Sequence, residues 1–210
     1  LTTRMLCSLA KVDMQKVNTG ETTEEDLLVL SDALLTLSDS KMYIDDSGNL
    51  SVADIRSRCR RQQTRYGLDL VVIDYLGLLQ LGNKRGSLVA DIAEATRALK
   101  ILAKELQVPI MLLCQLSRGS ESRKENGYRP ILADLRDSGA IEQDADMVLL
   151  LYRKALAMRN RKDDSEYGGA PAEEIEDNTA EVIVAKNRNG PLKTVNLAFQ
   201  GMFSRFVNPS

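Results

Sequence analysis

The clearest pattern along the chain is a set of short segments built wholly from apolar residues. They occupy positions 70–73, 108–114 and 147–152. Continuous apolar runs of this length are typical of strands buried on both faces of a parallel sheet. Residues 88–106 have helical periodicity, with Ile92, Leu99 and Leu102 on one stripe. Strand, helix and strand in this order predict a right-handed βαβ unit.

Two helices are predicted before the first apolar segment. Thr22 with Glu25, and Ser51 with Asp54, have the spacing of a capping box, in which a hydroxyl and an acid satisfy the free N–H groups of a helix start. The helical patterns that follow run to about residues 37 and 66.

Short strands complete the predicted fold. One strand is expected between the two helices, at residues 42–44. Apolar alternation near the carboxyl end predicts antiparallel strands at residues 180–186, 195–199 and 203–206. We therefore expect an α/β fold, with a mostly parallel central sheet flanked by helices and with C-terminal antiparallel strands. Residues 1–210 are expected to form one domain, with no second domain.

Composition excludes several kinds of site. The 210 residues include no His, and the Cys residues at positions 7, 59 and 114 are far apart, which argues against a zinc site or a His-activated nucleophile. With a net charge of -2, any nucleic-acid contact must come from local loops. Apolar runs stay shorter than the roughly 18 residues of a membrane span. A cytoplasmic location is therefore expected.

Polar residues follow two of the predicted strands. Asp74 comes directly after the first and Gln115 directly after the second. The carboxyl ends of parallel strands lie at one edge of a sheet, where open α/β sheets bind ligands. In P-loop nucleotide hydrolases, an acid at this position holds the magnesium ion of a bound nucleotide. The alternative is an aspartate in the turn that ends the strand.

Four motifs occur in order at residues 73–76 (Ile-Asp-Tyr-Leu), 115–119 (Gln-Leu-Ser-Arg-Gly), 136–146 and 185–191 (Ala-Lys-Asn-Arg-Asn-Gly-Pro). Together they resemble the carboxyl-terminal motor domain of the bacterial replicative DNA helicases, the DnaB-like branch of the RecA-type ATPases. The resemblance implies a RecA-like P-loop core and a homo-hexameric ring around single-stranded DNA. It also implies ATP and Mg²⁺ bound between neighbouring subunits, and a primase and a helicase loader as partners of the complete protein.

The resemblance assigns roles to individual residues. Asp74 corresponds to the Walker-B acid, which orders Mg²⁺ through water, and Gln115 to the polar sensor of the γ-phosphate. Lys186 and Arg188 correspond to the cations that reach into the neighbouring subunit's site as an arginine finger. Alternate residues of a strand point the same way, so both cations can project together. The alternative is a pair of solvated cations at a hairpin tip.

The same resemblance suggests DNA-binding residues. Arg136, Asp137 and Gly139 match the loop that lines the central channel, while Lys84 and Arg85 lie where a second channel loop is expected. Arg136 supplies charge that reads no base sequence. Gly139 lets the backbone approach a phosphate closely. For Asp137, a helix-capping turn with an internal Arg–Asp pair is the alternative.

One part of the family pattern is missing. The phosphate cradle GxxxxGK[ST] does not occur in these residues, nor does the acid that polarises the attacking water. We therefore expect an amino-terminally incomplete motor domain, which does not hydrolyse ATP by itself. A catalytically inert DNA- or subunit-binding fragment is one alternative. Another RecA-like ATPase, such as a recombinase, is a second, although the 136–146 and 185–191 motifs favour the helicase branch.

Overall fold

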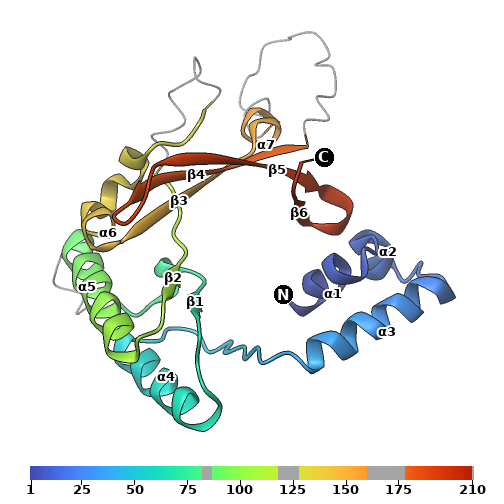
Figure 1. Ribbon diagram of the computed structural model, residues 1–210, viewed down its shortest axis with the longest axis horizontal. Coiled ribbons are helices and arrows are strands. Elements are labelled where there is room, and N and C mark those ends of the chain that lie inside the picture. Colours follow the sequence, from blue (N-terminus) through green and yellow to red (C-terminus); the bar gives the residue numbers. More distant parts are fainter. Residues whose placement is uncertain (82–86, 118–127, 160–177, 210) are drawn as a thin grey trace. The chain divides into compact units, whose positions relative to one another are not determined.

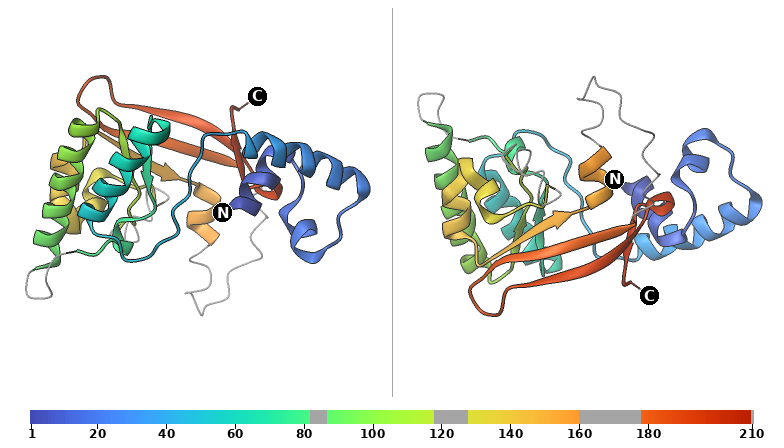
Figure 2. Two further views of the ribbon diagram at one scale, coloured as in Figure 1. Left: turned by 90° about the horizontal axis from the view of Figure 1, so that it is seen from below. Right: turned by 90° about the horizontal axis from the view of Figure 1, so that it is seen from above.

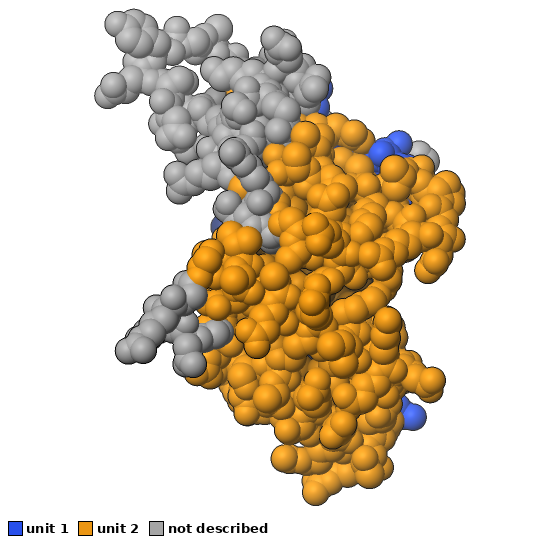
Figure 3. Space-filling view, turned by 90° about the vertical axis from the view of Figure 1, so that its left-hand side faces the viewer, with its two compact units in different colours: residues 1–45, 151–182, 194–210 blue, residues 46–150, 183–193 orange. Residues whose placement is uncertain are grey.

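The computed structural model describes residues 1–81, 87–117, 128–159 and 178–209, with only the backbone of residues 136–138, 158 and 159. The chain divides into two compact units (Figure 3). Unit 1 contains Leu1–Asp45, Leu151–Val182 and Thr194–Ser210, and unit 2 contains Asp46–Leu150 and Ile183–Lys193. The expectation of a single domain stays a prediction. Among the described residues, no helix has the length and apolar character needed to cross a membrane.

Unit 2 contains the predicted βαβ unit. Strand β1 (Val71–Ile73) pairs in parallel with β2 (Ile110–Leu112), and α5 (Leu88–Leu106) connects them (Figure 1). The predicted stripe of α5 is buried, and Leu102 has 0% exposure. It packs in one cluster with Ile73 and with Ile55 of α4 (Val52–Tyr66). The sequence prediction of this unit is confirmed.

Capping boxes mark where two of the long helices begin. Ser51 and Asp54 form the predicted capping box of α4, with the Asp54 amide donating to the Ser51 hydroxyl at 3.2 Å. Helix α3 (Glu24–Ser38) uses Thr23 and Asp26 instead of the predicted Thr22 and Glu25. The sequence Thr-Thr-Glu-Glu-Asp offers the same hydroxyl-to-acid spacing in two frames, and the structure adopts the second.

A second cluster in unit 2 lies on β3 (Met147–Tyr152). Val148 and Leu150 pack with Leu135 of the 3₁₀ helix η4 (Leu132–Ser138). Helix α6 (Gly139–Asp144) joins η4 to the strand. The chain from β2 reaches the same cluster through Leu116, which is partly buried there.

The described strands form two sheets. β1 and β2 make the parallel pair, and a four-stranded sheet has the order β3-β4-β5-β6, with β5 and β6 antiparallel. The remaining bounds are β4 Thr179–Asn187, β5 Lys193–Gln200 and β6 Arg205–Val207. The long β4–β5 hairpin is visible from two sides in Figure 2. The α/β class and the C-terminal antiparallel strands are confirmed.

The apolar strands are covered on one face only, against the expectation of burial on both. Along β3, Met147, Leu149 and Leu151 are exposed, whereas the residues between them are buried. Val72 and Met111 of the parallel pair are also exposed. Helices α4 and α5 pack against one side of this pair (Figure 1).

Unit 1 contains α1 (Thr2–Ala10), α2 (Met14–Thr19), α3, α7 (Lys154–Arg159) and the 3₁₀ helix η5 (Gly201–Phe203). In these helices the buried residues are Cys7 of α1, Val12 in the turn after α1, and Ala33 of α3. The predicted strand at 42–44 is wrong, because these residues are irregular and exposed. So short a segment forms a strand only beside a partner strand, and no described strand pairs with it.

Candidate functional site

Asp74 and Gln115 lie at the same edge of the parallel pair. The pairing continues past the strand ends, because the Leu113 amide donates to the Ile73 carbonyl at 2.9 Å. The Leu76 amide then donates to the Leu113 carbonyl, also at 2.9 Å. Asp74 is therefore flanked by these two bonds, and Gln115 follows Leu113 by two residues. The 3₁₀ helix η1 (Leu76–Leu78) and a cis Asp74–Tyr75 peptide bond follow the strand.

The side chains of Asp74 and Gln115 are exposed and free. Neither makes a hydrogen bond or ion pair with another residue that the structure describes. An aspartate that only ends a strand usually accepts a bond from a nearby amide, as in an Asx-turn. Asp74 does not do so, and η1 begins without a side-chain cap. The site thus presents a carboxylate and an amide whose bonding capacity remains for a ligand.

Lys186 and Arg188 are brought together at the carboxyl end of α6. The Lys186 ammonium donates to the carbonyl oxygens of Glu142 and, at 3.4 Å, Gln143. The Arg188 guanidinium donates to the Gln143 carbonyl as well. The last carbonyls of a helix have no partner within it, and cations commonly satisfy them. These two are therefore bound groups rather than freely solvated ones.

Asp146 is a member of this cluster that the sequence analysis missed. Its Oδ2 accepts a hydrogen bond from Lys100 of α5, and its Oδ1 lies 3.7 Å from Nη1 of Arg188. Its carbonyl accepts from the Arg188 amide at 2.9 Å. The Lys100 hydrogen bond, with the positive charges of Lys100, Arg188 and Lys104, lowers the pKa of Asp146. No spacing rule links Lys100 to Asp146 across 46 residues.

The proposed DNA residues are described in part. Arg136 and Asp137 lie in η4, with their side chains outside the described structure. Gly139 begins α6 with φ -48° and ψ -25°, and an added Cβ there would meet nothing within 4 Å. Neither the backbone nor a neighbouring group therefore requires glycine at this position. Lys84 and Arg85 lie outside the described residues.

Buried Asp134 connects the segment after β2 to η4 through its backbone carbonyl. Asp134, with 2% exposure, accepts a hydrogen bond from the Ile131 amide at 2.8 Å, which fixes the start of η4. Its carbonyl accepts from the Ser117 amide at 2.9 Å. The segment that carries Gln115 is thus bonded directly to the element that carries Arg136.

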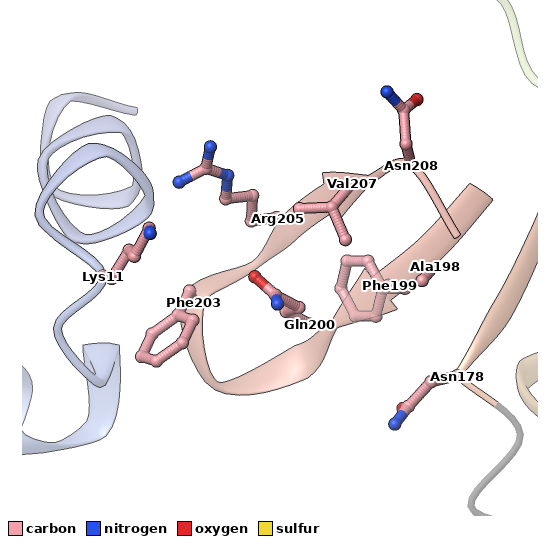
Figure 4. Close-up of a pocket in the computed structure, with 9 residues that line it drawn as sticks. All are labelled: Lys11, Asn178, Ala198, Phe199, Gln200, Phe203, Arg205, Val207 and Asn208. Atoms are coloured by element: carbon pink, nitrogen blue, oxygen red, sulfur yellow. The ribbon is translucent and has the colours of Figure 1, made fainter. Parts of the chain in front are cut away.

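A separate pocket lies in unit 1, between β5, β6 and the turn after α1 (Figure 4). Its volume is about 500 Å³. Lys11 and Arg205 contribute cations, Phe199 and Phe203 contribute rings, and its described lining includes no carboxylate. Arg205 also donates to the Ser8 carbonyl at 3.4 Å. None of the predicted site residues lines this pocket, and no sequence pattern predicted it.

The donor set fits a nucleotide-bound magnesium ion that keeps most of its water ligands. Mg²⁺ in nucleotide sites keeps several waters and takes one or two carboxylates besides the phosphates. Asp74 supplies one exposed carboxylate, and the described residues contain no group of three or more acids or cysteines that could hold a metal ion. They also contain no glycine-rich phosphate loop. Asp74 is suited to bind a water molecule of a nucleotide-bound Mg²⁺.

Fold and site define an α/β protein with free polar groups at the carboxyl edge of its parallel strands, the usual ligand edge of such folds. Two solved structures share the fold. One is described as an ATPase domain, and it matches with a TM-score of 0.82 and 36% identity, covering 99% of this chain and 69% of that one. The other is "The Structure Of A DnaB-Like Replicative Helicase And Its Interactions With Primase", which matches with a TM-score of 0.83 and 36% identity, covering 99% and 48%. The predicted RecA-like ATPase core is confirmed.

The family follows from sequence comparison. The family described as DnaB-like helicase C terminal domain matches residues 1–208. The Replicative DNA helicase DnaB of Leifsonia xyli subsp. xyli is 44% identical over 98% of this chain and 42% of its own length. The Replicative DNA helicase DnaC of Bacillus subtilis is 43% identical over 99% and 43%. The chain belongs to the DnaB-like replicative helicases, and it spans less than half the length of these relatives.

Proposed function

We propose that this chain is the motor part of a replicative ring helicase, which couples ATP hydrolysis at subunit interfaces to translocation on single-stranded DNA and duplex unwinding. The observation that carries the proposal is the pair of free side chains, Asp74 and Gln115, at the ligand edge of the sheet. The proposed activity is that of a longer polypeptide that also contains a phosphate-binding loop. We propose a homo-hexamer acting in the cytoplasm, with a primase and a helicase loader as partners.

In this proposal Asp74 and Gln115 have different roles at the nucleotide. The Asp74 carboxylate would hold nucleotide-bound Mg²⁺ through water, and the ion would supply positive charge against the phosphates. The Gln115 amide donates to the γ-phosphate or to the attacking water without adding charge. Both positions are fixed by the paired strands and by the buried stripe of α5 beneath them.

Lys186 and Arg188 act on the ATP bound by a neighbouring subunit. A cation delivered to the γ-phosphate neutralises charge that develops during phosphoryl transfer. The Arg188 side chain is 48% exposed, so part of its guanidinium is open to another subunit. The five N–H donors of a guanidinium outnumber its contacts to Gln143 and Asp146.

DNA is held by the η4–α6 junction. Arg136 contacts backbone phosphates, Asp137 contributes its main-chain N–H or orients Arg136, and Gly139 leaves space for close approach of the strand. Lys84 and Arg85 supply a second contact. The bond between Ser117 and Asp134 supports a coupling of DNA binding to Gln115, since it joins the two elements directly.

The proposal is tested by replacing Asp74 in the full-length, assembled protein. Asp74→Asn removes the charge but keeps the shape, and we expect DNA-stimulated ATPase to fall by about 10- to 100-fold, as for other groups that act on a metal through a bound ligand. Asp69→Asn is the matched control, because Asp69 is an exposed aspartate just before the same strand. Equal ATPase rates in the two variants would refute the role of Asp74. An assembled wild-type protein that binds DNA without hydrolysing ATP would instead support the inert alternative.

A further inference from the structure

The two proposed finger cations occupy carbonyl groups of their own subunit. Lys186 and Arg188 bind the last carbonyls of α6, and Arg188 also approaches Asp146. Without these contacts, the ammonium of Lys186 and the guanidinium of Arg188 would be free to bind a phosphate. A cation bound in this way must exchange partners before it can serve a neighbouring site fully.

Asp146 divides its two oxygens between two cations. Oδ2 binds Lys100, whereas Oδ1 lies 3.7 Å from Arg188, so the contact with Arg188 is the looser of the two. An arginine and a carboxylate bind most strongly through two parallel hydrogen bonds. Lys100 competes with that arrangement, because it already donates to one of the two oxygens. Lys100 therefore limits the strength with which Asp146 can hold Arg188.

Helix α6 connects these contacts to the proposed DNA loop. It begins at Gly139, two residues after Asp137, and its six residues span about 9 Å at the helical rise. Its last residue, Asp144, accepts a hydrogen bond from the buried Thr96 of α5 at 2.7 Å. The proposed DNA loop and the finger cations thus lie at opposite ends of one short, anchored helix.

We propose that Asp146 and the last carbonyls of α6 hold Lys186 and Arg188 in a retracted position, and that DNA binding at the start of α6 releases them. Asp146 is a positioning residue in this scheme, and Lys100 sets how firmly it acts. The inference rests on the proposed function, since it assumes that Arg188 acts on a neighbour's ATP.

Two substitutions alter the same ion pair with opposite consequences. Asp146→Asn removes the charge that holds Arg188, and we expect the ATPase rate without DNA to rise about two- to fivefold, as for loss of a half-exposed ion pair. Lys100→Met leaves both oxygens of Asp146 to Arg188, and we expect that rate to fall. If the pair were only structural, both variants would change the rate in the same direction.

The experiment uses the full-length hexamer, with ATPase measured with and without an oligo-dT strand. Glu105→Gln is the control for Asp146→Asn, because Glu105 pairs with Arg56 and Arg60, which belong to a different ion-pair group. Arg97→Met is the control for Lys100→Met, because Arg97 is an exposed cation of α5 that is not among the groups acting on Asp146. Affinity for the same strand is measured by fluorescence anisotropy. Because binding and release are linked, Asp146→Asn should bind DNA more tightly.

An unchanged or lower DNA-free rate in Asp146→Asn would overturn the proposal, as would a higher rate in Lys100→Met. A raised rate without tighter DNA binding would overturn the link through α6. Arg188→Ala separates this inference from the proposed function. If Arg188→Ala leaves ATPase unchanged, the finger role and this inference both fail. If Arg188→Ala lowers it and Asp146→Asn does not raise the DNA-free rate, only the inference fails.

Discussion

Arg188 offers the sharpest test of whether the ATP site is shared between subunits. Arg188→Ala removes the guanidinium while leaving the β4 strand that precedes it intact. The lost contacts within the subunit involve one carbonyl and a half-exposed ion pair, so folding should be little affected. Loss of an arginine finger lowers the rate by about 10³- to 10⁵-fold. A large loss of ATPase with normal stability is therefore expected.

Mixing two inactive variants then shows whether Arg188 acts in trans. In a ring, each interface joins Asp74 of one subunit to Arg188 of its neighbour. An equal mixture of Asp74→Asn and Arg188→Ala subunits gives about one interface in four with both native residues, because each interface draws its two sides independently. ATPase should therefore recover to at most about a quarter of the wild-type rate.

The assay reassembles the mixed subunits and follows phosphate release at saturating ATP and oligo-dT. The control is each variant carried alone through the same procedure. Recovery clearly above the mean of these two rates supports a shared site. If the mixture has only that mean rate, both residues act on the ATP of their own subunit, and the assignment of Arg188 to the neighbouring site is wrong.

Two predictions concern the scaffold. Leu102→Ala should lower the free energy of unfolding by about 3–5 kcal/mol in urea titrations, because Leu102 has 0% exposure. The control Ile101→Ala, at the adjacent exposed position, should change it by less than about 1 kcal/mol. Similar losses in the two variants would contradict the core described for α5. Hydrogen bonds from the side chain and amide of Ser51 lower the pKa of Asp54, so its contribution to stability is present above its unfolded pKa and is lost as the pH falls through its lower, folded pKa. Asp54→Asn should flatten the acid side of the stability curve below about pH 4, and an unchanged curve would exclude this contribution.

The sequence predicted the local parts of the fold well. Apolar runs located β1, β2 and β3, and the Ser51–Asp54 spacing located the start of α4, because each signal is complete within a few consecutive residues. The strand expected at 42–44 failed because a three-residue strand depends on a partner that periodicity cannot supply.

The site could be predicted only where topology determines it. Parallel pairing places Asp74 and Gln115 at one edge, so strand direction alone was enough. The cluster at the end of α6 was different. It joins Lys100 to Asp146 and Arg188 to Gln143 across 46 and 45 residues, through side chains whose meeting depends on how α5, α6 and β4 pack. Such long-range polar contacts leave no periodic trace in the sequence.

The one-sided burial of β3 favours association of the 210-residue chain in concentrated solution. Met147, Leu149 and Leu151 follow one another at every second position, so they form a continuous apolar strip with about 7 Å between neighbours. With a net charge of only -2, repulsion between copies is weak, and such a strip favours association. Acidification toward neutrality of charge weakens the repulsion further. We therefore expect this chain to be less soluble near its isoelectric point of about 5.4 than above neutral pH.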